Sequence, residues 1–183
     1  MSYETRGENR KADWRFDHPC NDHACVSDRR FGYWRDIMKP HTLYIGIDPG
    51  THTGVSVWSR LERRLWMVDT MTITQAMKTV EDYVCTCDVE GNQRFEVVVY
   101  IEDARKRTWF GSSNREKLQG AGSVKRDCSI WETFCEELGV ECRKIAPKHN
   151  TTKLTASQFK VLTNWQGRTS EHSRDAAMLV FGR

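Results

Sequence analysis

Three acidic residues stand where predicted strands end or where a predicted helix begins. Asp48 ends the alternating apolar run 43–47 and precedes a Pro-Gly-Thr turn. Glu102 ends the nearly continuous apolar run 95–101, and Asp175 lies near the start of the last predicted helix. Carboxylates delivered to the rim of a sheet provide the oxygen ligands that hard divalent cations prefer. These positions therefore indicate metal or phosphate chemistry.

Each acid also has an ordinary structural explanation. Asp48 suits an Asx-type turn that closes a hairpin, and Asp175 suits the positive end of a helix dipole. Neither explains the set of three, nor His172, which lies three residues before Asp175 and so on the same helical face. Three neighbouring carboxylates repel one another and are tolerated mainly around divalent cations.

Oxygen-rich ligation favours Mg²⁺ or Mn²⁺ over zinc, with His172 as a nitrogen ligand or proton-transfer group. Two such ions in one site can activate a water and stabilise the leaving oxygen of a phosphodiester. We therefore expect Asp48, Glu102, His172 and Asp175 to form one metal-binding catalytic site.

The segment that follows Glu102 is basic and aromatic. Cations beside aromatic side chains are typical of loops that hold a nucleic-acid backbone and stack on its bases. The alternative is a solvated charged loop whose aromatic residues pack on the core. The residues predicted to contact substrate here are Arg105, Lys106, Arg107, Trp109 and Phe110.

Hydrophobic periodicity predicts the elements that position these residues. The expected strands cover 43–48, 54–59, 65–71, 95–102 and 140–146, and the expected helices cover 73–84, about 114–138, about 154–165 and 170–181. Thr72 or Thr74 is expected to cap the first helix, and Thr169 or Ser170 the last. The continuous apolar run before Glu102 suits a strand that is covered on both faces.

The long helix 114–138 is expected to bury one stripe and to end at Gly139. Glycine at 120 and 122 suggests that another backbone, a ligand or a partner chain comes close there. The residues of the stripe are Ile130, Trp131, Phe134, Cys135 and Leu138.

Composition limits the class of protein. The 183 residues, 38% hydrophobic and 29% charged, suit one domain with a short appendage. The net charge of +3 is only mildly basic, so a nucleic-acid surface has to be local. We expect no membrane span and no signal peptide, and the seven cysteines lack the spacing of a disulfide framework. This predicts a cytoplasmic protein, in the host cytoplasm if it is viral.

Residues 1–40 form the predicted appendage, and 41–183 the main domain. The appendage holds four possible zinc ligands within eight residues, whereas structural zinc sites usually take two separated pairs. An extended aromatic and basic arm is therefore favoured, and a small Zn²⁺ element remains the alternative. The possible ligands are His18, Cys20, His23 and Cys25.

Four short motifs occur in a characteristic order: Ile-Gly-Ile-Asp-Pro-Gly-Thr at 45–51 with Gly54, Tyr-Ile-Glu at 100–102, Gly-Ala-Gly at 120–122 and His-Ser-Arg-Asp-Ala-Ala at 172–177. Over roughly residues 43–181 the chain resembles the RuvC family of Holliday junction resolvases. The resemblance implies an α/β protein with the RNase H-like fold. Its mixed central sheet, with three antiparallel strands followed by parallel strands, would be flanked by helices.

The resemblance also implies a function. It predicts a homodimeric, metal-dependent endonuclease that resolves four-way DNA junctions by paired phosphodiester hydrolysis, in recombination and repair. Asp48, Glu102 and Asp175 would be metal-binding acids, His172 would occupy a position that the family fills with an acid or a histidine, and Lys153 would lie near the scissile phosphate. An aromatic residue after the second acid, Trp109 or Phe110, would stack on a base.

Two features differ from the family pattern, namely the N-terminal extension and the strongly basic loop. They leave other branched or flapped DNA open as the substrate, and they would suit a bacteriophage or other compact-genome member. A sugar-kinase or actin-like ATPase would need two such domains, which 183 residues do not supply. A DNA-binding protein that has lost its chemistry is the other alternative, although all the acids are retained.

Overall fold

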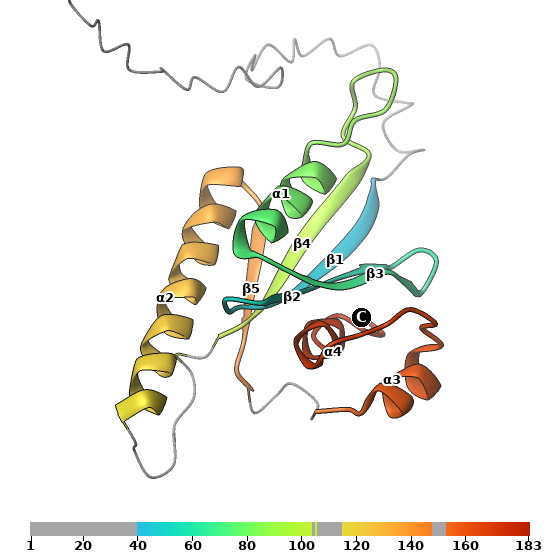
Figure 1. Cartoon of the computed structure of the whole chain (residues 1–183). Helices are drawn as coiled ribbons and strands as arrows, with labels where there is room; N and C mark the ends of the chain where they lie inside the picture. The colour runs from blue at the N-terminus through green and yellow to red at the C-terminus, as the bar shows by residue number, and fades with distance from the viewer. Residues whose placement is uncertain (1–39, 104, 106–114, 148–152) are drawn as a thin grey trace, which may run out of the picture. The chain divides into compact units, whose positions relative to one another are not determined.

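The computed structural model describes residues 40–103, 105, 115–147 and 153–183, with the backbone alone for 115–121. Figure 1 shows the arrangement of the helices and strands. In chain order they are β1 (His41–Asp48), β2 (Thr53–Ser59), β3 (Arg64–Met71), α1 (Ile73–Val84), β4 (Phe95–Glu102), α2 (Arg115–Leu138), β5 (Glu141–Ile145), α3 (Ala156–Thr163) and α4 (Glu171–Met178).

The five strands form one mixed sheet in the order β3-β2-β1-β4-β5. Short hairpin connections make β1, β2 and β3 antiparallel, whereas β4 and β5 are parallel to their neighbours because each is reached through a helix. This is the predicted RNase H-like arrangement, and the fold prediction is confirmed.

Alternation along the strands divides the core into two layers. Leu43, Ile45 and Ile47 of β1 are fully buried and pack with side chains of α1 and α2. Helix α4 lies on the opposite face of the sheet (Figure 1). There Tyr100 of β4 and Phe159 of α3 pack with Ala177 of α4. The interior strand β4 contributes buried side chains to both layers, as its continuous apolar run predicts.

Side-chain caps begin three of the helices. The side chains of Thr72, Thr155 and Ser170 each accept a hydrogen bond from the backbone N–H of the residue three positions on. The side chain of that residue accepts a hydrogen bond from the backbone N–H of the cap. Two alternatives are thereby decided: Thr72 caps α1 and Ser170 caps α4. Gly139 follows α2 with φ of +71°, the conformation expected of a glycine stop.

One prediction about α2 is corrected: Ile130 is 42% exposed and does not belong to the buried stripe, whereas Trp131 and Cys135 are fully buried. A Cβ built on Gly122 would meet no atom of the described residues within 4 Å, so no backbone of the described part of the chain comes close at this glycine. The approach of a ligand or a partner chain there stays a prediction. The close backbone approaches occur instead at glycines of the sheet.

Several predictions fall outside the described residues. They are the arm 1–39 with its possible zinc ligands His18, Cys20, His23 and Cys25, and the loop residues Lys106, Arg107, Trp109 and Phe110. The division of the chain at residue 40 also stays a prediction. Within the described part, no helix combines the length and apolarity needed to cross a membrane.

Candidate active site

Strand register brings two of the predicted acids to the same end of the sheet. Ile47 of β1 pairs with Ile101 of the parallel strand β4, so Asp48 and Glu102 follow at equivalent positions. The side chains of Ile47 and Ile101 belong to the layer under α1 and α2. Because side chains alternate along a strand, the next residues, Asp48 and Glu102, face the layer that α4 covers.

Helix α4 supplies the partner of Asp48. Nδ1 of His172, in the first turn of the helix, lies 2.8 Å from Oδ2 of Asp48. The Asp48 side chain is 16% exposed and the imidazole 53% exposed, so the carboxylate is enclosed while the ring reaches solvent. The β1–β2 turn is closed by Thr53, whose hydroxyl donates to the carbonyl of Gly50 at 2.8 Å. Asp48 therefore faces α4, and the hydrogen bond that closes its turn comes from another residue.

Two glycines allow α4 to lie directly on the sheet. A Cβ on Gly54 would be 2.1 Å from the carbonyl oxygen of His172, and a Cβ on Gly46 would be 2.1 Å from that of Ala176. Real Cβ atoms do not approach so closely, so any other residue would displace the helix. Both glycines belong to the first sequence motif, but the sequence analysis did not predict that they allow α4 to approach the sheet. The available signal was a pair of strand glycines together with the small residues Ser173 and Ala176 on the helix.

The Asp48 carboxyl is largely buried and lies near two other acidic side chains. Burial raises its pKa from the ordinary 3.8 to about 6, and the nearby carboxylates of Glu102 and Asp175 add to the increase. The hydrogen bond and the charge of His172 act in the opposite direction. The other three predicted site residues are thus within electrostatic reach of this one carboxyl group.

Asp175 shows the same effect. Its pKa is raised first by burial and then by the charges of Glu102 and Glu171, while Lys153 and His172 lower it. The Nζ of Lys153 lies 2.5 Å from Oε1 of Glu171, and its side chain is exposed beside the acids. The structure therefore places Lys153 near Asp175, and its contact with substrate stays a prediction.

The donors suit a divalent cation in their chemistry. Three carboxylates and one imidazole from β1, β4 and α4 lie at this end of the sheet. Burial first, and then the neighbouring carboxylates, raise the pKa of Asp48 and of Asp175, and a bound cation would favour the charged forms. Among the residues that the structure describes, no three potential ligands are close enough to enclose an ion. Metal binding would therefore require the side chains to draw together around the ion.

Arg105, predicted to contact substrate, is held by acids of its own chain. Its Nε donates to Oδ1 of the buried Asp103 at 2.8 Å, and its Nη1 donates to Oε2 of Glu132 at 2.8 Å. These bonds join the end of β4 to α2 and engage both sides of the guanidinium. Its contact with substrate stays a prediction.

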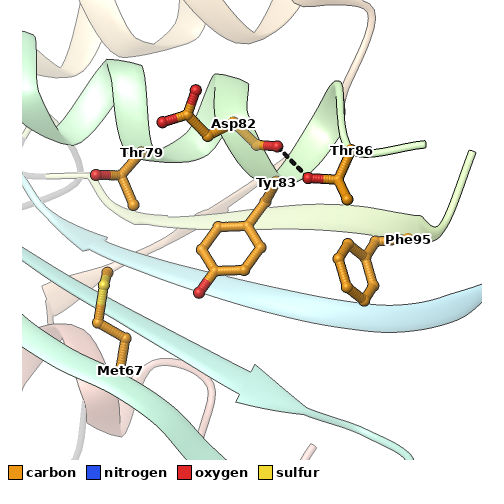
Figure 2. Close-up of a pocket in the computed structure, with 6 residues that line it drawn as sticks. All are labelled: Met67, Thr79, Asp82, Tyr83, Thr86 and Phe95. Carbon is orange, nitrogen blue, oxygen red and sulfur yellow. Dashed lines mark hydrogen bonds between the residues drawn. The ribbon is translucent and has the colours of Figure 1, made fainter. Parts of the chain in front are cut away.

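A pocket of about 290 Å³ lies between α1, β3 and β4 (Figure 2). Its wall includes Met67, Tyr83 and Phe95, and the Thr86 hydroxyl beside it donates to the carbonyl of Asp82. Phe95 begins β4 opposite His41, at the end of the parallel strands away from Asp48 and Glu102. This pocket is separate from the candidate site.

Comparison with known proteins gives a distant structural similarity. No protein-family model and no curated protein matches the chain. The chain is similar to a solved structure described as T. thermophilus RuvC in complex with Holliday junction substrate, with 20% sequence identity and a TM-score of 0.47. The match covers 76% of this chain and 90% of that chain. The fold assignment rests on the strand order and directions described above.

Proposed function

We propose that this chain is a divalent-metal-dependent endonuclease that resolves four-way DNA junctions by paired phosphodiester hydrolysis. The observation that carries the proposal is the enclosed Asp48 carboxylate, which bonds to His172 and lies within the field of Glu102 and Asp175. A site with this excess of negative charge is suited to bind cations.

The residues take distinct roles in this proposal. Asp48, Glu102, His172 and Asp175 would hold two Mg²⁺ or Mn²⁺ ions, which would supply an activated water and stabilise the leaving oxygen. Asp48 orients the imidazole through Nδ1, and this leaves Nε2 as the ring's second polar atom for a ligand or a proton. Lys153, exposed beside Asp175, would meet the phosphate that is cut.

Four-way DNA as the substrate follows from the order of the four motifs, which resembles that of junction resolvases. Such enzymes cut two strands symmetrically, so the proposal includes a homodimer. The loop residues Lys106, Arg107, Trp109 and Phe110 would contact the DNA near the cut. A nuclease of flaps or other branched DNA, and a junction-binding protein without catalysis, are the alternatives to be tested.

Cleavage assays test the proposal directly. Labelled four-way junctions, flaps and linear duplex are incubated with Mg²⁺, Mn²⁺ or EDTA and with wild type, Asp48→Asn or Asp82→Asn. Asp82 lies on α1 across the sheet, 62% exposed and paired with Lys78, so its variant is a charge-matched control. We expect paired, metal-dependent nicks with wild type and the control, and a loss of at least about 100-fold with Asp48→Asn.

Each other outcome has a definite meaning. Cleavage of flaps alone would keep the nuclease and change its substrate. Junction binding without cleavage in any metal would disprove the catalytic proposal. Equal activity of Asp48→Asn and wild type would remove Asp48 from the catalytic site.

A further inference from the structure

A second groove, of about 410 Å³, lies between α3 and the segment that leads into α4. No site residue predicted from the sequence belongs to it. Its lining includes Ser157, Lys160, Trp165, Gly167, Arg168 and Thr169. Cations, hydroxyl groups and an aromatic ring thus meet in one hollow.

The charge of this groove is positive. Lys160 on α3 and Arg168 on the connecting segment both line it, and both are exposed. Its lining contains no carboxylate. Within the described part of the chain neither cation forms an ion pair, whereas the nearby Lys153 is paired with Glu171. The groove is therefore complementary to an anion.

An aromatic wall accompanies the two cations. Trp165 is half-buried, with its ring packed against the core layer under α3 and α4. The ring lies directly against Gly167, where an added Cβ would be 2.8 Å from the indole Nε1. Nε1 itself is buried and finds no hydrogen-bond partner among the described residues. Cations beside an aromatic wall match the combination of phosphate and base in a nucleotide strand.

The groove is joined firmly to the helix that carries two site residues. Arg174 of α4 donates from Nε to the carbonyl of Leu154, just before α3, at 2.7 Å. The same guanidinium donates from Nη1 to the carbonyl of Thr169, on the groove wall, at 3.2 Å. His172 and Asp175 lie on either side of Arg174 in sequence. The groove and the first turn of α4 are thus held together as a unit.

We propose that this groove binds one strand of the DNA substrate close to the bond that is cut. Lys160 and Arg168 receive backbone phosphates, and the wall at Trp165 receives the adjoining sugar and base. The inference rests on the proposed function for its choice of ligand. An acidic peptide would match the charge as well, but the shared helix α4 places the groove beside a site proposed to act on phosphodiesters.

DNA binding without cleavage provides the test. The affinity of a four-way junction for the Lys160→Gln/Arg168→Gln variant is measured by fluorescence anisotropy in EDTA over a series of salt concentrations. Each lost phosphate contact is expected to reduce the slope of log K against log salt by roughly 0.7 to 0.9. The binding should weaken uniformly across sequences, because phosphate contacts do not read bases.

The matched control removes the same charge elsewhere. Arg60 and Arg63 lie in the β2–β3 turn, and the backbone N–H of Arg60 bonds to the carbonyl of Thr42 at the opposite end of β1 from Asp48. Arg60→Gln/Arg63→Gln should leave the slope unchanged. The charge-preserving variant Lys160→Arg/Arg168→Lys should restore it, and thermal melting confirms that each variant is folded.

The outcomes separate this inference from the proposed function. A folded Lys160→Gln/Arg168→Gln variant with wild-type affinity and slope would overturn the proposal that the groove binds DNA, whatever the nuclease activity. Equal losses in the groove variant and the turn control would also overturn it, because the effect would then be one of net charge. Wild type that binds junctions without cutting them would disprove the nuclease proposal. The reduced salt slope of the Lys160→Gln/Arg168→Gln variant would then still support DNA binding by the groove. Wild type that binds no DNA would overturn both.

Discussion

At the scale of single residues, Asp48 combines enclosure with a position among other acids. Its carboxyl group is 16% exposed, close to Glu102 and Asp175, and its pKa is raised to about 6. The charged form is thus less stable in the folded protein than in the unfolded chain. The burial of this carboxylate therefore lowers the stability of the folded state, and this cost can be measured without any activity assay.

The sign follows from the two pKa values. Below pH 3.8 the carboxyl is protonated in both states and contributes no penalty; as the pH rises to about 6 the unfolded chain ionises first, and the folded state loses stability. Above pH 6 the full penalty, of about 3 kcal/mol in the absence of metal, remains. We expect Asp48→Asn to raise the free energy of unfolding by about 1–2 kcal/mol at pH 7, because the neutral amide carries no penalty for buried charge. The gain is smaller than the full penalty because the amide loses part of the bond to His172.

Urea unfolding in EDTA at pH 7 and at pH 3.5 checks this prediction. The stabilisation by Asp48→Asn should be present at pH 7 and absent at pH 3.5. An asparagine variant that is less stable than wild type at pH 7 would show that the hydrogen bond to His172 outweighs the burial of charge.

At the scale of elements, the contact of α4 with β1 and β2 determines the position of His172 relative to Asp48. Gly54 and Gly46 lie against the backbone carbonyls of His172 and Ala176. Serine and alanine at 173, 176 and 177 are fully buried on the helix side. The small side chains on both surfaces allow a closer approach than ordinary helix–sheet packing, and this approach brings His172 to Asp48.

Gly54→Ala is expected to lift the first turn of α4 from β2. We expect a loss of about 3 kcal/mol in the free energy of unfolding, because the new methyl meets backbone that cannot rotate away. The bond between His172 and Asp48 should also lengthen, which would appear as changed chemical shifts of the imidazole in NMR spectra of the folded variant.

Gly122→Ala provides the control within α2. Its Cβ would meet nothing within 4 Å, and alanine favours the helix by up to about 1 kcal/mol, so this variant should be as stable as wild type or more so. Equal stability of Gly54→Ala and wild type would contradict the close approach.

At the scale of the whole domain, the site is assembled from both halves of the sheet and from the last helix. Asp48 belongs to the antiparallel part, Glu102 to the first parallel strand, and Asp175 to a helix more than 70 residues later in the chain. A cation bound among them would join these elements, and it would stabilise the native state because the unfolded chain has no such site.

We therefore expect Mn²⁺ or Mg²⁺ to raise the melting temperature of the wild type. At a concentration 100 times the dissociation constant the stabilisation is about 2.7 kcal/mol. Asp175→Asn should lose most of this increase, whereas the control Asp82→Asn should retain it. An equal rise in all three proteins would indicate that metal binds elsewhere.

Local sequence patterns predicted most of the fold. The run 95–102 was predicted to be a strand covered on both faces, and β4 has these bounds and this burial. Caps such as Thr72 were predictable because a side chain and the next turn of helix lie within a few residues of each other. The four site residues were selected in the same way, from their positions at the ends of such elements.

Tertiary structure alone decided which distant groups meet. The bond between Asp48 and His172 joins residues 124 positions apart, and the role of Gly54 depends on which helix lies above it. Arg105 was predicted to face substrate, yet Asp103 and Glu132 hold it in the structure. Periodicity in a sequence reports which face of an element is buried, but it carries no information about what covers that face. The covering element is selected by the packing of the whole sheet and its helices.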